Sequence, residues 1–164
     1  GDYGTKLIAW MKANATKELS EVYGTVEVDA DQAYEAFAAL PLLRQAGIPV
    51  APIVLAEQAR VALGDEIGGA MGARLVAMLI GERPGLTALD SLGIYLTYAP
   101  RRGRTDAERN CISNIHPPEG LGYTDAARIA AGLVVGARRL GRSGVDLKDT
   151  SRAELEGADL RGLD

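Results

Sequence analysis

Three polar clusters in the sequence hold the side chains that could bind a ligand. They are residues 57–61 (EQARV), 81–86 (GERPGL) and 106–114 (DAERNCISN). The first two follow apolar stretches that are typical of buried strands. Because open α/β sheets bind ligands beyond the carboxyl ends of their strands, we expect all three clusters to gather at one edge of a sheet.

Glu82 is the acidic residue with the most distinctive position. It ends an apolar stretch and is followed, after Arg83, by Pro84-Gly85, a pair that favours a tight turn. One interpretation is a surface ion pair in a loop. The other is a carboxylate that accepts hydrogen bonds from a ligand's amides or hydroxyls, with its direction set by the turn. The residues alone leave both open.

The remaining candidates are weaker. The glycines of residues 64–72 lack the spacing of a dinucleotide-binding turn, and Asp65-Glu66 would repel a phosphate. His116 stands beside two prolines without a cluster of metal-ligand spacing, which favours a loop residue. Cys111 could be a nucleophile, but a single cysteine more often packs as a small buried apolar group.

Hydrophobic spacing predicts the elements that must position these clusters. We expect helices over residues 4–21, 31–46, 65–72 and 124–140, strands over 25–28, 50–55, 74–81 and 92–98, and a long loop over 100–122. Gly47 is a candidate C-cap and Thr124 a candidate N-cap. Strands alternating with helices predict an α/β fold with three layers: a mostly parallel sheet with helices on both faces, a Rossmann-like arrangement.

Composition limits the class of protein. With 164 residues, 47% hydrophobic and 24% charged, the chain suits one soluble globular domain. A net charge of -4 argues against nucleic acid or an anionic membrane as the main partner. The longest apolar run, residues 75–80, is too short to span a bilayer. The arginines within residues 101–104 and 138–142 are interpreted as a solvated face or loop in preference to an anion site.

Several long segments together resemble the ethanolamine ammonia-lyase light chain. In the family's order and at its separations the sequence has residues 60–68, 79–86 (LIGERPGL), 91–95 (SLGIY) and 106–115 (DAERNCISNI). The resemblance is strong from 50 to 115 and extends more weakly over 2–149. We take residues 1–149 as one α/β domain. Residues 150–164 form a polar tail that suits a linker or a docking peptide.

This resemblance implies a subunit that is inactive alone and carries no catalytic residue. Family members pair it with a heavy chain that converts ethanolamine to acetaldehyde and ammonia with adenosylcobalamin, in the cytoplasm or a bacterial microcompartment. The light chain closes over the cobalamin through positions that match Arg60, Val61, Glu82 and Cys111. Arg60 would donate to amide carbonyls or the nucleotide-loop phosphate, Val61 would pack on the ligand, Glu82 would accept from a corrin amide, and Cys111 would offer a small surface.

The sequence also departs from the family pattern. It starts at the α/β domain without the usual N-terminal extension, and residues 26–31 stand where the family has a Ser-Asp-Gly-Leu-Ser strand end. These departures favour two alternatives, a stand-alone cobalamin-binding or assembly module and a divergent or engineered scaffold that binds nothing. The GERPGL and DAERNCISNI segments favour ligand binding, on the argument that a fold alone would not require them.

Overall fold

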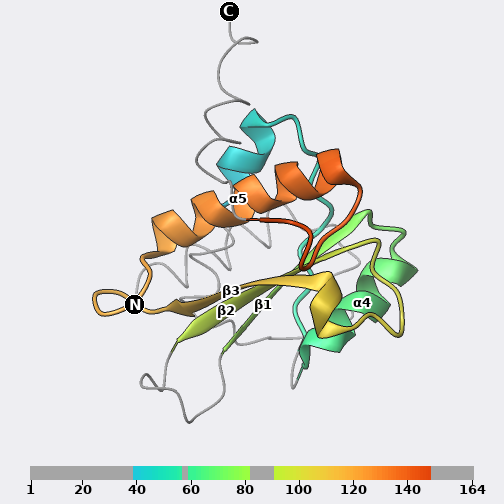
Figure 1. The fold of residues 1–164 in the computed structure, drawn as a ribbon, viewed down its shortest axis with the longest axis horizontal. Coiled ribbons are helices and arrows are strands. Elements are labelled where there is room, and N and C mark those ends of the chain that lie inside the picture. The colour runs from blue at the N-terminus through green and yellow to red at the C-terminus, as the bar shows by residue number, and fades with distance from the viewer. Residues whose placement is uncertain (1–38, 57–58, 82–90, 149–164) are drawn as a thin grey trace, which may run out of the picture.

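The computed structural model describes residues 39–56, 59–81 and 91–148 (Figure 1). Its elements are a helix over 39–45, α4 (Val61–Ala70), β1 (Leu75–Gly81), β2 (Leu92–Tyr98), the single-turn 3-10 helix η1 (Asp106–Glu108), β3 (Arg109–Ile115) and α5 (Tyr123–Leu140). The predicted helix over 4–21, the predicted strand over 25–28, the unmatched segment 26–31 and the polar tail lie outside the described residues.

The described sheet is antiparallel, with strand order β1-β2-β3. The prediction of a three-layer, mostly parallel, Rossmann-like sheet is therefore wrong for the described part of the chain. Residues 82–91 and 99–108 connect the strands. A parallel crossover needs a dozen or more residues to return the chain to the same edge, so connections this short favour antiparallel pairing.

The strand predictions had mixed outcomes. The strand over 92–98 is confirmed, and the strand over 74–81 is confirmed from Leu75, although it is only half-buried because it lies at an edge of the described sheet. Residues 50–55 contain no strand, and Pro52 cannot donate a ladder hydrogen bond. The predicted loop over 100–122 was wrong because it contains β3, whose polar residues hid the strand pattern.

Helix α4 begins at Val61 and ends at Ala70, earlier than the predicted helix over 65–72. Its glycines allow it to lie close to the sheet. A Cβ atom at Gly68 would stand 2.6 Å from the ring of Pro100, and one at Gly64 would stand 3.6 Å from the side chain of Met78. The glycines therefore allow close packing, and this packing offsets their unfavourable helix propensity.

Helix α5 covers the opposite face of the sheet (Figure 1). Its small buried residues, among them Ala126, Ala130 and Ala137, pack with Leu133 and Val134 on the apolar side chains of β2 and β3. The helix is capped by Gly122 and not by the predicted Thr124. The C-cap prediction at residue 47 is confirmed, since Gly47 has a φ of 64° and Ile48 N–H donates to Leu43 O at 2.9 Å.

Candidate functional site

The face of the sheet turned toward α4 carries one of the predicted site residues, Cys111. Leu92, Ile94 and Leu96 of β2 belong to the core under α5. Because side chains alternate along a strand, Tyr95 and Thr97 point to the α4 side. Tyr95 pairs with Met78 of β1 and with Cys111 of β3, so these three residues form one row across the sheet.

Three of the four predicted cobalamin contacts lie on α4 or on β3. Arg60 is the exposed N-cap of α4 and Val61 is the first residue of the helix. Gly64, one turn later, contacts the Met78 end of the row, and exposed Cys111 forms the other end. At the usual strand spacing Met78 and Cys111 are roughly 10 Å apart, so α4 and Cys111 lie toward opposite edges of this face.

Glu82 lies outside the described residues. Gly81, which precedes it, ends β1 opposite Leu92. The expectation that a single cysteine packs as a buried apolar group is wrong for Cys111, because the side chain is exposed on β3.

A buried ion pair lies beside this surface, and sequence reasoning missed it. Asp65 accepts two hydrogen bonds of 2.7 Å from the guanidinium of Arg109, and the two side chains are only 3% and 4% exposed. Arg109 also donates to Thr97 Oγ1 and to Arg104 O, both at 2.9 Å. The hydrogen bonds that Arg109 donates to Asp65 raise the pKa of Arg109 against the opposing effect of burial.

The pair changes how the Asp65-Glu66 sequence is interpreted. Asp65 was taken as a charge that would repel a phosphate, but Arg109 neutralises it, while Glu66 binds Arg102 at 2.8 Å. One Arg109 atom, Nε, is buried without a hydrogen-bond partner, and the nearest carboxylate oxygen, Asp106 Oδ1, is 3.5 Å away. Arg109 stands among the polar residues of DAERNCISNI, so the sequence held no pattern that singled out the pair.

The DAERNCISNI segment has structural roles at most of its positions. Asn110 donates from Nδ2 to Gly144 O and Leu147 O and accepts from Gly144 N–H at 2.7 Å, which attaches β3 to the loop after α5. Asn114 has a φ of 60° and accepts the Leu121 N–H at its carbonyl. The argument that a fold alone would not require this segment was therefore wrong for these residues.

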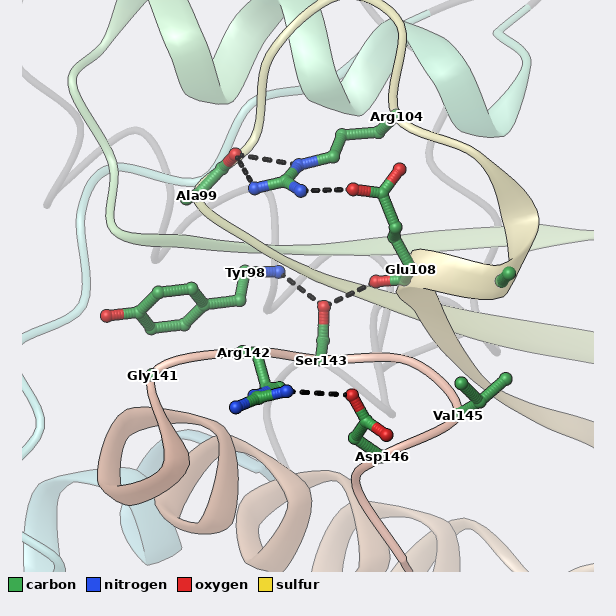
Figure 2. A pocket seen from close by; sticks show the side chains of 10 residues that line it. Tyr98, Ala99, Arg104, Glu108, Gly141, Arg142, Ser143, Val145 and Asp146 are labelled. Carbon is green, nitrogen blue, oxygen red and sulfur yellow. Dashed lines mark hydrogen bonds and ion pairs between the residues drawn. The ribbon is translucent and has the colours of Figure 1, made fainter.

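A separate hollow of about 380 Å³ opens between the end of β2, η1 and the loop after α5 (Figure 2). Its polar groups bond to one another. Ser143 Oγ accepts from Tyr98 N–H and donates to Glu108 O, while Arg104 donates to Ala99 O and to the Glu108 carboxylate. Arg104 thus lies in a loop, as the interpretation of its arginine-rich segment allowed, but its side chain is only 16% exposed. None of the described predicted contacts lines this hollow, so it is not the candidate site.

Glu108 is the most strongly shifted acid among the described residues. Hydrogen bonds from the Thr105 backbone N–H and from Arg104 lower its pKa from 4.5 to about 2. These interactions fix η1, which leads directly into β3. Glu108 therefore helps to hold the start of β3, the strand that carries Cys111.

The part of the chain that the structure describes contains neither a candidate metal site nor a candidate membrane span. No cluster of three or more His, Cys, Asp or Glu side chains there could hold a metal ion, and His116 Nε2 lies 2.7 Å from Asn114 Oδ1. No helix in the same ranges combines the length and apolarity needed to cross a membrane.

Comparison with known proteins agrees with the resemblance carried by the GERPGL and DAERNCISNI segments. Residues 24–148 match the family described as ethanolamine ammonia-lyase light chain (EutC). The chain is similar to proteins named ethanolamine ammonia-lyase small subunit from Rhodococcus erythropolis, at 70% identity over 105 residues, and from Rhodopseudomonas palustris strain BisA53, at 60% over 115 residues. A third, from Ralstonia nicotianae, is 55% identical over 121 residues.

The aligned part covers 64% of this chain and 41% of the Rhodococcus protein, 70% and 44% for Rhodopseudomonas, and 74% and 44% for Ralstonia. The chain therefore spans less than half the length of these curated relatives. The family match still covers most of the sequence, including α4, the whole described sheet and α5. On this match, which contains both ends of the Met78–Tyr95–Cys111 row, the chain belongs to the ethanolamine ammonia-lyase light-chain family.

Proposed function

We propose that this chain serves as the small subunit of an adenosylcobalamin-dependent ethanolamine ammonia-lyase. In this function it covers one side of the cobalamin, while a heavy chain converts ethanolamine to acetaldehyde and ammonia. The contacts are Arg60, Val61 and Cys111, together with Glu82. The chain itself carries no catalytic residue in this proposal and acts only in the assembled enzyme.

The observation that supports the proposal most is the shared face of α4 and β3. Val61 at the start of α4 and Cys111 on β3 lie on the same side of the sheet, with half-buried Tyr95 in the row between the helix and Cys111. A surface with an apolar floor and a few polar groups at its margin suits a large ligand that carries amide groups around an apolar ring. The described residues therefore fit the cofactor that the family uses.

The electrostatics around Arg60 support its assigned role. The first turn of α4 contains no acidic residue, so the partial positive charge of the helix N-terminus is not cancelled there. Arg60 precedes this turn and is exposed, so its guanidinium can donate to a carbonyl or a phosphate. Both features favour a polar, electron-rich part of a ligand at this end of the surface.

The cofactor would supply the radical chemistry when bound, through homolysis of its cobalt–carbon bond, and the protein would supply binding and orientation. For this chain that means packing by Val61, donation by Arg60 and a small contact surface at Cys111. A small residue at position 111 matters because a larger one would occupy space over the sheet.

A steric block on β3 tests the proposal. We expect Cys111→Trp, in the full chain co-expressed with an ethanolamine ammonia-lyase heavy chain, to raise the Kd for hydroxocobalamin by at least about tenfold, because the indole would fill the ligand surface. Trp is favoured in strands, so the fold should be retained. Absorbance titration of the purified complex gives the Kd, and acetaldehyde formation reports activity.

The matched control is Ala77→Trp. Ala77 is also a small exposed strand residue, but it pairs with Leu96 and so points to the α5 face. This variant should leave the Kd within about twofold of the parent. A Kd that is unchanged in Cys111→Trp would contradict the proposed contact. Cobalamin binding by the chain without a heavy chain would instead favour the stand-alone module.

A further inference from the structure

Asp65 and Arg109 connect the two ends of the proposed cobalamin surface. Asp65 lies four residues after Val61, one turn along α4, and Arg109 lies two residues before Cys111 on the same strand face. The pair therefore joins the helix that carries one candidate contact to the strand that carries another. Among the ion pairs of the described residues, this is the one that links α4 to β3.

The geometry of the pair suits a rigid connection. Both carboxylate oxygens of Asp65 accept from the two terminal nitrogens of Arg109 at 2.7 Å, which fixes the relative orientation of the planar groups. Thr97 Oγ1 and Arg104 O accept further hydrogen bonds from the same guanidinium. With both side chains nearly inaccessible, solvent cannot substitute for either partner.

Packing alone would hold α4 less specifically. The helix packs on β1 and Pro100 at Gly64 and Gly68, which have no side chains to interlock with their neighbours. A glycine face can slide over its neighbours, whereas a bidentate ion pair permits one register. The polar connection therefore determines where the first turn of α4 stands relative to β3.

We infer that Asp65 and Arg109 are positioning residues for the cobalamin surface, setting the separation of Val61 and Cys111 without touching the ligand. The inference rests on the proposed function. It concerns binding geometry, so its signature is a change in how the bound cofactor is held, beyond any loss of stability.

Arg109→Lys and Asp65→Asn test the inference in the full chain assembled with a heavy chain. Lys keeps the charge but loses the bidentate fork, and Asn keeps the shape but loses the charge. We expect each to raise the Kd for hydroxocobalamin by at least about tenfold, the lower end of what supporting partners contribute at metal sites. The circular dichroism of the corrin bands should also change, because the ring is held at a different angle.

A variant on the far face separates positioning from stability. Leu133→Ala removes core packing under α5 and leaves α4 untouched. The urea midpoints of Leu133→Ala and of the pair variants measure how much stability each has lost. Leu133→Ala should keep the Kd within about twofold of the parent and should leave the corrin spectrum unchanged. An equal weakening by Leu133→Ala at an equal loss of stability would overturn the inference, as would unchanged Kd and spectrum in the pair variants.

Thr97→Val is the milder variant if the charged pair proves necessary for assembly. It removes one acceptor from Arg109 at nearly constant volume, and we expect a smaller rise in Kd with the same spectral change. If Cys111→Trp weakens binding while Thr97→Val, Arg109→Lys and Asp65→Asn all behave like Leu133→Ala, only the inference fails. If Cys111→Trp has no effect, the proposed function fails and the inference with it.

Discussion

Single residues in this chain differ sharply in how far their types predicted their roles. Cys111 was interpreted as a small buried apolar group and is exposed, while Asp65, whose charge was expected to repel a phosphate, is buried against Arg109. A residue type gives only an average burial. The partner that makes a buried carboxylate tolerable lies 44 positions away in sequence, so local spacing could not predict the pairing.

Glu108 gives a prediction for the dependence of stability on pH. Its folded-state pKa of about 2 lies below the ordinary 4.5, so its stabilising contribution is complete above pH 4.5 and is lost as the pH falls toward 2. Urea unfolding across this range should show a steeper fall in stability for the parent than for Glu108→Gln. If the stability of the parent and of Glu108→Gln fell in parallel as the pH is lowered, the prediction would be contradicted.

Arg104→Ala refines that experiment. The Thr105 backbone N–H makes the largest contribution to the lowered pKa of Glu108 and remains in this variant. We therefore expect Arg104→Ala to retain part of the pH dependence that Glu108→Gln removes.

At the scale of elements, helices α4 and α5 use small residues to approach the sheet from opposite sides. Their presence was predictable, but the start of α4 was not, because the glycines at 64 and 68 reduced the apparent helix propensity. In the structure both face the sheet, where the absent side chain permits contact. A glycine that weakens an isolated helix can thus be the residue that lets it pack.

Two substitutions distinguish these glycines. Gly68→Ala would put a Cβ atom 2.6 Å from the Pro100 ring, so we expect a loss of about 1–3 kcal/mol in the free energy of unfolding from overpacking. Gly64→Ala meets Met78 at an ordinary 3.6 Å and should be neutral or stabilising by up to about 1 kcal/mol through helix propensity. Urea denaturation measures both, and equal effects would show that space at α4 does not decide the outcome.

At the scale of the whole molecule, β3 holds both sides of the described fold together. Its adjacent residues Arg109 and Asn110 point to opposite faces, the first to α4 and the second to the loop after α5. Gly144 comes so close to η1 that a Cβ atom there would stand 2.1 Å from Ala107 O. Closure of the described domain therefore depends on a strand that the sequence pattern did not reveal.

Asn110→Ala tests this closure. It removes three hydrogen bonds to the loop after α5, at about 1 kcal/mol each, so we expect the free energy of unfolding to fall by about 2–3 kcal/mol. Amide exchange at Leu147 should accelerate. Arg142→Ala, which removes an exposed ion pair to Asp146 in the same loop, should cost less than about 1 kcal/mol. A comparable loss in both variants would mean that the Asn110 contacts do not hold the loop.

The sequence by itself determined the family, through long specific segments, and it determined β2, most of β1 and α5, whose periodic patterns are strong. It also named Arg60, Val61 and Cys111 as contacts to test, beside Glu82 outside the described residues. Only the tertiary structure decided that the described strands are antiparallel and that β3 exists, because pairing direction depends on which distant segments meet. It also decided that Cys111 shares a sheet face with the start of α4, since that placement depends on the register of three strands and the buried pair between Asp65 and Arg109.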